Sequence, residues 1–436
     1  MENLERKDIQ GILLSSYSHL YWAFYVLLQV QEPAAARRGL AAIIDKVTTA
    51  EGKEEGCSVN VAFTQSGLLK LGLNSGALES FPIAFREGMS SDHRARILGD
   101  TRGSAPSAWA WGGPTNSVDI LLMLFAPDEP AVTAQLEKAR LLIPANGVVE
   151  IATLAAQRYP DNKEHFGFAD GIGQPVVEGS GLLKRQRERT GHATQIKAGE
   201  FILGYSNEYG IPSDSPAVGA AEDPQRLLPE HASGGRDLGR NGTYLVFRQM
   251  SQNVADFWRF LDEATRTSNG ESDEKARERL GAKFVGPWKS GAPLVQAPGE
   301  DRPDLANENN FEYAKLDPHG FACPFSAHVR RANPRDSLGD DPEDALARTR
   351  RHRLLRRGRS YGPRAADPLV EDGKERGLHF ICLNSDIERQ FEFVQQTWIN
   401  NPVFHGLTGE VDPLIGDVDR GKGLLTMQSD PIRTCI

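Results

Sequence analysis

Two kinds of hydrophobic pattern divide the chain into expected strands and helices. The apolar runs DIQGILLSS (residues 8–16) and YWAFYVLLQV (21–30) each predict a strand. The segment SVNVAFTQSGLLKLGL (58–73) predicts a strand followed by a helix. Residues 117–143 predict the same order, with Asp128 or a neighbouring residue near the start of the helix.

The strand–helix order returns in the second half of the chain. It recurs in residues 241–266 and in residues 377–398, where Ser385 and Asp386 are candidates for capping the helix. Two halves that each carry such units indicate an α+β protein with a duplicated architecture.

The length predicts two domains, because 436 residues exceed the usual size of one. Long stretches rich in glycine, proline and aspartate separate the regular segments, and loops of this length are usually functional or mobile. We place the boundary near residue 195, before the strand-like segment EFILGYS (200–206). The expected domains are residues 1–195 and 196–436.

Composition narrows the class of protein. The formal net charge of -9 argues against general binding of nucleic acid. The four cysteines form no C-x-x-C pair, so a disulfide scaffold or a zinc ribbon is not expected. The N-terminal stretch is charged, and the longest apolar runs are shorter than a membrane span. We therefore expect a soluble, cytoplasmic protein without a membrane partner.

The segment HFGFADGIGQP (165–175) sets Asp170 between Gly167 and Gly171. Such a segment can form a turn, a phosphate loop, a calcium loop, or a loop that holds a carboxylate over a reactive group. No D-x-[DN]-x-[DN]-G ladder and no G-x-G-x-x-G or G-K-[ST] pattern is present. The phosphate and calcium interpretations therefore lack support.

A second informative segment is DPHGFACPFSAHVRRANPR (317–335), in which His328 precedes Arg330, Arg331 and Arg335. A neutral imidazole can ligate iron, and nearby guanidinium groups can pair with the carboxylates of a bound cofactor. An isolated histidine is more often a core or surface residue. Cys323 is a rival ligand, although a plain buried cysteine fits it better, and spacing alone does not decide between these interpretations.

The third segment, RTRRHRLLRRGRSYGPR (348–364), holds eight arginines in seventeen residues. It is compatible with a nucleic-acid patch or with a solvated basic face. The apolar pair Leu354 and Leu355 indicates that some of these arginines point inward.

Together these segments resemble the dye-decolorising peroxidase family. GFADG resembles the family's G-x-x-D-G motif, CPFSAHVRRANPR its haem-ligand segment, LLRRGRSYG its distal-arginine segment, and SDIERQFEFVQQTW its C-terminal helix. The motifs occur in the family's order and span most of the chain. The resemblance implies two ferredoxin-like α+β domains, each an antiparallel sheet with packed helices. It also implies heme b (iron protoporphyrin IX) in the C-terminal half, capped by the Asp170 loop.

On one side of the haem, the resemblance makes His328 the proximal iron ligand. The other ring nitrogen of His328 needs a partner that fixes its tautomer. Glu392 is the expected partner, with Asp386 as the alternative. Arg330 and Arg331 are the expected partners of the haem carboxylates.

On the opposite side, the resemblance makes Asp170 the acid–base that moves a proton between the two peroxide oxygens. Arg356 would stabilise the negative charge that develops as the O–O bond breaks. Leu378 and Phe380, which alternation places on one strand face, would shield the distal pocket or serve as ordinary core residues, and both interpretations expect them to be buried. Tyr361 matches a surface electron-relay position, although an ordinary turn tyrosine fits it better.

The activity implied is a haem peroxidase that reduces hydrogen peroxide and oxidises dyes and small phenolic compounds in one-electron steps. Two alternatives stay open. The chain could handle haem and release its iron, as a deferrochelatase does, or it could be a non-catalytic module that binds an acidic partner. The sequence leaves open whether the protein is a monomer or a dimer.

Overall fold

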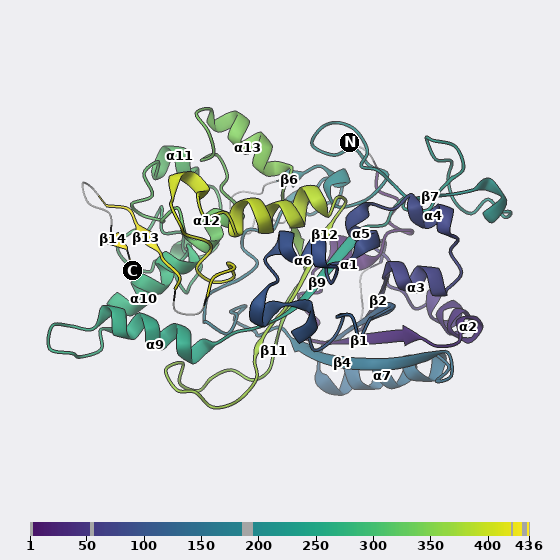
Figure 1. Ribbon diagram of the computed structural model, residues 1–436, viewed down its shortest axis with the longest axis horizontal. Helices are drawn as coiled ribbons and strands as arrows, with labels where there is room; N and C mark the ends of the chain where they lie inside the picture. The colour runs from purple at the N-terminus through teal and green to yellow at the C-terminus, as the bar shows by residue number, and fades with distance from the viewer. Residues whose placement is uncertain (1–2, 53–55, 185–194, 420–421, 430–433, 436) are drawn as a thin grey trace.

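A computed structural model describes residues 3–52, 56–184, 195–419, 422–429 and 434–435. An eight-stranded sheet with the order β10-β12-β11-β4-β1-β3-β2, and with β9 paired to β12, runs through the molecule (Figure 1). Its strands are β1 (Trp22–Val30), β2 (Ser58–Phe63), β3 (Ile120–Ala126), β4 (Val148–Gln157), β9 (Tyr244–Ser251), β10 (Leu355–Arg356), β11 (Arg359–Tyr361) and β12 (Gly377–Asn384). All of its pairings are antiparallel.

The longer helices flank this sheet at both ends of the molecule. In Figure 1, α7 lies beneath β4, whereas α9 and α10 lie at the opposite end. The helices are α1 (Gly11–Leu14), α2 (Pro33–Ile44), α3 (Gln65–Lys70), α4 (Ser75–Glu79), α5 (Ile83–Glu87), α6 (Asp92–Leu98), α7 (Glu129–Leu142), α9 (Val254–Thr265), α10 (Glu274–Val285), α11 (Tyr313–Leu316), α12 (His328–Ala332) and α13 (Pro342–Arg350). Two π-helical segments, Glu388–Glu392 and Val394–Ile399, follow β12.

Short elements complete the fold. The remaining strands are β5 (Val176–Val177), β6 (Gln195–Ile196), β7 (Ala217–Val218), β8 (Arg236–Asp237), β13 (Thr426–Met427) and β14 (Thr434–Cys435). Single 3-10 turns lie at Arg102–Ser104, Pro106–Ala108, Ala198–Glu200, Ala220–Glu222, Pro303–Leu305 and Phe404–Gly406. Within the described residues, no helix has the length and apolar character needed to cross a membrane.

The helix α7 shows how the sequence produces a local element. The Asp128 carboxylate accepts the Ala131 N–H at 2.8 Å, which caps the helix as predicted. Val132, Leu136 and Ala139 form its buried stripe. The stripe packs against β1 and β3, and every residue of β3 is buried. The apolar pattern of residues 117–143 therefore gives the predicted strand and helix.

The strands of the two halves of the chain share one hydrophobic core. Tyr25 of β1 and Phe247 of β9 pack edge to face with ring centroids 5.3 Å apart. Between these two groups of strands, β11 pairs with β4 through Ser360 and Gln157. The halves are thus packed together along one seam, and the functional residues described below lie on segments of both.

Most of the predicted regular elements are confirmed, and two are wrong. Residues 8–16 contain the short helix α1 instead of a strand, and residues 200–206 begin at the last residue of the 3-10 turn Ala198–Glu200 and form no strand. Both apolar runs contribute buried residues to one hydrophobic cluster, which includes Ile12 and Ile202. A short run in which most residues are buried shows neither the period of a strand nor that of a helix. Its sequence therefore does not distinguish a strand from a short helix or turn. The domain boundary near residue 195 stays a prediction, and it adjoins residues outside the described part of the chain.

Candidate active site

The Asp170 loop turns on its glycines. Gly167 and Gly171 adopt φ values of 94° and 86°, a region that side-chain-bearing residues rarely enter. The Asp170 N–H donates to the Asn162 carbonyl at 2.9 Å and closes the loop. Open space lies where a Cβ at Gly171 or Gly173 would stand. The glycines therefore shape a tight turn and leave room beside it for a flat ligand.

Asp170 and Arg356 form an ion pair. The distance from Asp170 Oδ1 to Arg356 Nη1 is 3.0 Å, and 45% and 37% of their side-chain surfaces stay exposed. Burial alone would raise the pKa of Asp170, but Arg356, the Gly171 N–H and the charge of His328 outweigh it and lower that pKa. The carboxylate is therefore held ionised within the electrostatic reach of both Arg356 and His328.

Arg356 reaches Asp170 because β10 is paired with β12 and because its own N–H donates to Gln174 Oε1 at 3.1 Å. The next residue, Arg357, donates instead to the carbonyls of Ile12 and Leu13. The two neighbouring arginines therefore point different ways, and the structure brings Arg356 to Asp170.

His328 is the first residue of α12, and a buried carboxylate stands behind its ring. His328 Nδ1 lies 2.9 Å from Asp412 Oδ2, and Asp412 has no exposed side-chain surface. Asp412 Oδ1 accepts the N–H groups of Leu414 and Ile415 at 2.9 and 3.0 Å. Burial would lower the pKa of His328, but Asp412 outweighs it and the pKa is raised. The contact directs Nδ1 to Asp412 and leaves Nε2 as the ring nitrogen for a ligand.

Two arginines near this site lack an acidic partner. Arg335 donates to the backbone carbonyls of Asn309 and Phe311, and Arg353 donates to that of Gly173. Burial, together with the charges of Arg335 and other arginines, lowers the pKa of Arg353 to about 9. In the part of the chain that the structure describes, neither forms an ion pair. The residues present therefore fit haem: one available imidazole nitrogen, glycine-lined space, and positive charge for two carboxylates.

The comparisons with known proteins agree with this geometry. A dye-decolorizing peroxidase of Mycetinis scorodonius is 30% identical over 441 residues, which cover 96% of this chain and 78% of the relative. A multifunctional dye peroxidase of Amycolatopsis is 31% identical over 377 residues, covering 82% and 71% of the two chains. No family model matches the chain.

The chain belongs to the dye-decolorizing peroxidase family.

The solved structure of a dye-decolorizing peroxidase from Auricularia auricula-judae superposes with a TM-score of 0.77 at 25% identity, covering 98% of this chain and 92% of that one. The predicted pair of ferredoxin-like α+β domains is thereby confirmed, and so is the prediction of a haem peroxidase.

The structure corrects the expected partner of His328 in this peroxidase. Glu392 bonds to Arg94 at 2.6 Å, with both side chains 7% exposed. Asp386 accepts the Arg389 N–H at 2.9 Å beside the start of the first π-helical segment, whose N-cap residue is Ile387. Both carboxylates are therefore occupied elsewhere, and Asp412 takes the position behind the ring. Asp412 lies 84 residues beyond His328, and its Asp-Pro pair recurs elsewhere in the sequence, so no local signal identified it.

The structure also corrects the role expected of Arg330 and Arg331. Both are fully buried. Arg330 pairs with Asp317 at 2.9 Å, and Arg331 donates to the Trp398 and Glu410 carbonyls at 2.9 and 2.7 Å. Arg330 is paired with a carboxylate, and neither arginine has exposed surface, so neither is directed toward haem carboxylates.

Three further expectations concern residues around the site. Leu378 and Phe380 lie on the strand face that holds Cys382, as predicted, but both are half-buried and not buried. Burial raises the pKa of the Cys323 thiol to about 11, and Cys323 packs in a hydrophobic core cluster with Trp288 and Tyr313, as expected for a plain buried cysteine. Tyr361 is also half-buried, with its ring 4.6 Å from that of His379.

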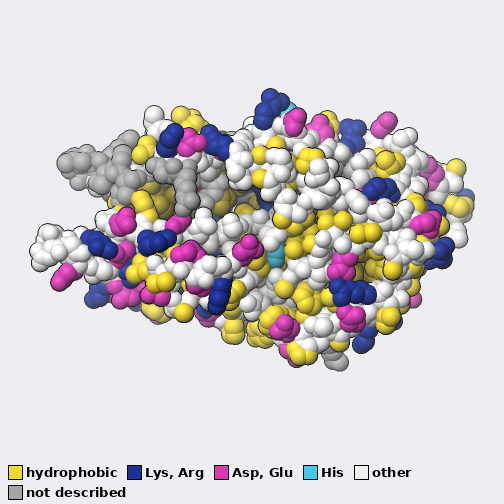
Figure 2. All heavy atoms as spheres, turned by 60° about the horizontal axis from the view of Figure 1, so that its bottom comes forward, with side chains coloured by type: hydrophobic (Ala, Val, Ile, Leu, Met, Phe, Trp, Pro, Cys, Tyr) yellow, Lys and Arg dark blue, Asp and Glu magenta, His cyan; other side chains and the backbone are white. Residues whose placement is uncertain are grey.

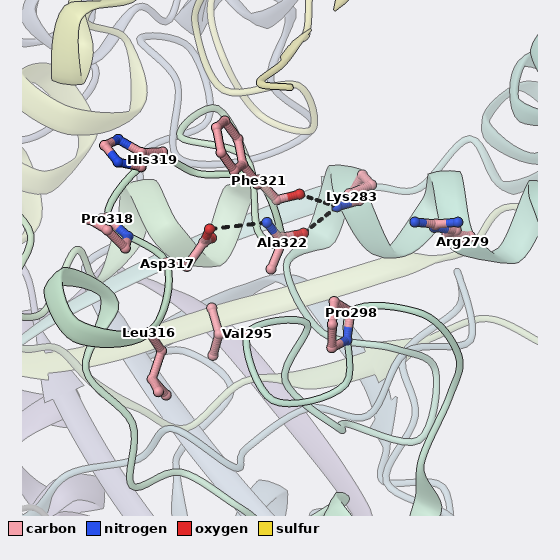
Figure 3. A pocket seen from close by; sticks show the side chains of 10 residues that line it. All are labelled: Arg279, Lys283, Val295, Pro298, Leu316, Asp317, Pro318, His319, Phe321 and Ala322. Carbon is pink, nitrogen blue, oxygen red and sulfur yellow. Dashed lines mark hydrogen bonds between the residues drawn. The ribbon is translucent and has the colours of Figure 1, made fainter. Parts of the chain in front are cut away.

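The loop before α12 is fastened from two sides (Figure 3). Lys283 of α10 donates to the carbonyls of Phe321 and Ala322. The Asp317 carboxylate accepts the N–H groups of Ala322 and Cys323 at 3.0 and 2.8 Å. A cavity of about 310 Å³ lies beside these contacts, and its lining includes none of the predicted site residues. These contacts fix the segment that delivers His328.

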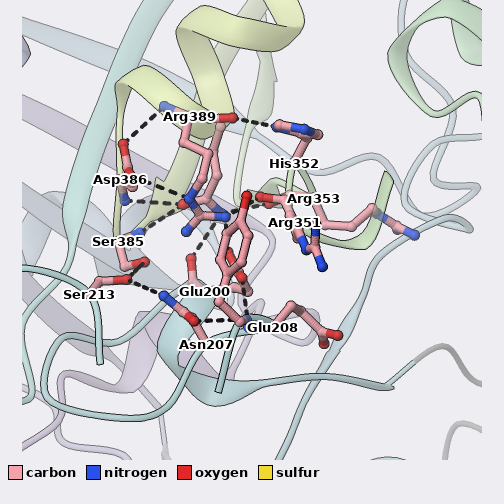
Figure 4. A network of polar contacts seen from close by, with 12 residues as sticks. Glu200, Asn207, Glu208, Ser213, Arg351, His352, Arg353, Ser385, Asp386 and Arg389 are labelled. Carbon is pink, nitrogen blue, oxygen red and sulfur yellow. Dashed lines mark hydrogen bonds and ion pairs between the residues drawn. The ribbon is translucent and has the colours of Figure 1, made fainter. Parts of the chain in front are cut away.

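A buried ionic network fastens the arginine-rich segment (Figure 4). Glu200, with no exposed side-chain surface, pairs with Arg389 at 2.7 Å. The neighbouring Gln390 side chain donates to the carbonyls of Glu200 and Arg353, both at 2.9 Å. The network therefore holds the backbone from which Arg353 and Arg356 extend.

The His328–Asp412 contact gives a prediction. Replacing Asp412→Asn removes the charge that strengthens the imidazole as a ligand, so the rate of reaction with peroxide should fall ~10- to 100-fold. Stopped-flow absorbance of the haem-loaded protein measures this rate. The matched control is Asp386→Asn, which removes a carboxylate that bonds to the Arg389 N–H and not to His328. Equal rates in the two variants would contradict the assignment of Asp412.

Proposed function

We propose that this dye-decolorizing peroxidase binds heme b through His328 and uses Asp170 and Arg356 to activate hydrogen peroxide. When bound, the haem supplies the redox-active iron through which electrons pass from the reductant to peroxide. The observation that carries the proposal is the ion pair of Asp170 with Arg356, held near an imidazole whose Nδ1 contacts a buried carboxylate.

The cofactor would be held by two kinds of contact. His328 Nε2 would bind the iron while Asp412 fixes the ring. Arg335 and Arg353, which form no ion pair within the described residues, would neutralise the two haem carboxylates.

Asp170 would handle the proton of the reaction. Reducing one hydrogen peroxide to two waters consumes two electrons and two protons, and the O–O bond breaks heterolytically. The ionised Asp170 accepts the proton from one peroxide oxygen and returns it to the departing one. Arg356 stabilises the negative charge that develops on that departing oxygen. The Gly171 N–H, 2.6 Å from Asp170 Oδ1, keeps the carboxylate oriented between these steps.

Small aromatic compounds are the proposed electron donors. A solved dye-decolorizing peroxidase that is 25% identical to this chain forms a complex with 2,6-dimethoxyphenol. The electrons would be taken one at a time, so two donor molecules restore the enzyme. The cytoplasmic location stays a prediction. Whether the protein is a monomer or a dimer stays open.

Release of iron from haem is the second candidate. A Yersinia pestis protein named deferrochelatase is 36% identical over 107 residues, but these cover 24% of this chain and 20% of that protein. The peroxidase relatives match over far more of the chain. Haem that survives turnover with peroxide, with no free protoporphyrin formed, would support the peroxidase.

A binding module built on the basic segment has less support. Arg359 is buried and donates to the carbonyls of Leu20 and Tyr17, and Arg357 is directed to those of Ile12 and Leu13. Several of the arginines thus point inward, as Leu354 and Leu355 predicted. The face shown in Figure 2 carries basic and acidic side chains interspersed.

Removing the distal groups tests the acid–base role. Asp170→Asn and Arg356→Leu should each keep the Soret absorption of bound haem yet slow the reaction with peroxide by ~10²–10⁴-fold. The matched control is Asp161→Asn, which breaks the Asp161–Arg364 ion pair nearby and leaves the site intact. A wild-type rate in Asp170→Asn, measured by stopped-flow absorbance, would sink the assignment.

The lowered pKa of Asp170 gives a pH dependence. The carboxylate must be ionised to accept a proton, so the acid limb of the activity profile lies at a pH set by a pKa below its usual value of ~3.9. A distal imidazole would already be protonated well above that pH. We expect dye oxidation to peak in the acidic range. A pH–rate profile of the wild type that peaks above pH ~7 would contradict this role.

A further inference from the structure

The carboxylate of Glu164 lies inside the same loop as Asp170 and binds its backbone. Glu164 Oε2 accepts the Phe166 N–H at 2.7 Å, and Oε1 accepts the Phe168 N–H at 2.8 Å. Oε2 also accepts the side-chain N–H of Gln252, which follows β9, at 2.6 Å. One carboxylate thus joins two backbone donors of the loop to the end of a sheet strand.

The donors around Glu164 are all neutral. Across the described residues, Glu164 takes part in no ion pair, although Arg364 lies within electrostatic reach. Burial raises the pKa of Glu164, and the negative charge of Asp170 adds to that increase, while the hydrogen bonds oppose both. Burying part of a carboxylate costs free energy unless the carboxylate keeps its hydrogen bonds. The loop conformation that supplies these hydrogen bonds is therefore favoured over others.

The other contacts of the loop leave these two N–H groups to Glu164. The Phe166 carbonyl accepts the Trp258 indole N–H at 3.2 Å. The Ala169 N–H donates to the Lys289 carbonyl at 3.2 Å, and the Asp170 N–H donates to the Asn162 carbonyl. Without the carboxylate, the N–H groups of Phe166 and Phe168 would lose their acceptor.

We propose that Glu164 is a positioning residue: its carboxylate fixes the backbone of residues 165–169 and thereby holds the Asp170 carboxylate against Arg356. This inference rests on the proposed function, because it assumes that Asp170 must meet peroxide. A displacement of about 1 Å in a group of this kind can slow a reaction ~10²-fold. The glycines permit the turn, and Glu164 selects one conformation of it.

The first test compares Glu164→Gln with Glu32→Gln. The amide introduced by Glu164→Gln keeps one oxygen but places an NH₂ group against a backbone N–H. Glu32 also accepts two backbone N–H groups, those of Ala34 and Ala35, at the start of α2, so its replacement is a matched control. Glu164→Gln should retain haem with an unchanged Soret band and react with peroxide ~10-fold more slowly, whereas Glu32→Gln should react as the wild type does.

The second readout needs no activity. In the haem-free protein, hydrogen exchange at the amides of Phe166 and Phe168 should quicken ~10-fold or more in Glu164→Gln and stay unchanged in Glu32→Gln. Gln252→Leu, which removes the side-chain donor and keeps the carboxylate, should move exchange and rate in the same direction by a smaller factor. That variant decides the question if Glu164→Gln does not fold.

The apparent pKa of Asp170, measured on the acid side of the pH–rate profile for the peroxide reaction, distinguishes two roles of Glu164. Glu164 either positions the loop or acts only through its negative charge. If the loop loosens, Asp170 loses its contact with Arg356 and the apparent pKa rises. If Glu164 acted only as a negative neighbour, its removal would lower the apparent pKa of Asp170, which Arg356 and His328 also face. A fall in that pKa, or unchanged amide exchange in both Glu164→Gln and Gln252→Leu, would overturn the proposal. A wild-type rate in Asp170→Asn would instead reject the proposed function, and the exchange measurement would still decide on Glu164.

Discussion

The site depends on one buried contact, the hydrogen bond between the Asp412 carboxylate and the His328 ring. Removing a charged carboxylate from water costs free energy unless hydrogen bonds replace those to water. Two backbone N–H groups and the imidazole provide such contacts to Asp412. The contact fixes both the tautomer and the orientation of the ring. It also joins α12 to a residue that lies 84 positions further along the chain.

The arginines of the arginine-rich segment make different kinds of contact. Arg357 and Arg359 fasten the segment to the N-terminal residues 12–20 through backbone carbonyls. Arg356 pairs with Asp170, while Arg353 stays without a carboxylate in the described structure. One run of basic residues therefore serves the packing of the two halves and also supplies the arginine that pairs with Asp170.

Local patterns in the sequence were enough for several features of fold and site. A continuous apolar run indicated β3, the helical pattern with Asp128 near its start indicated α7, and the flanking glycines indicated the tight loop around Asp170. The predictions that were wrong concerned contacts that depend on tertiary packing. Arg330 and Arg331 sit beside the iron-ligand candidate in sequence, but their direction depends on Asp317 and on carbonyls of distant segments. Asp412 lies far along the chain from His328, so no local spacing could join them.

The central claim is that one imidazole, that of His328, holds the haem. Titration of the haem-free protein with hemin, followed by Soret absorbance, tests it most directly in wild type and His328→Gly. We expect the wild type to take up one haem per chain, and His328→Gly to bind it weakly until free imidazole is added to replace the missing ring. Tight binding by His328→Gly with the spectrum of the wild type, and without imidazole, would contradict the account.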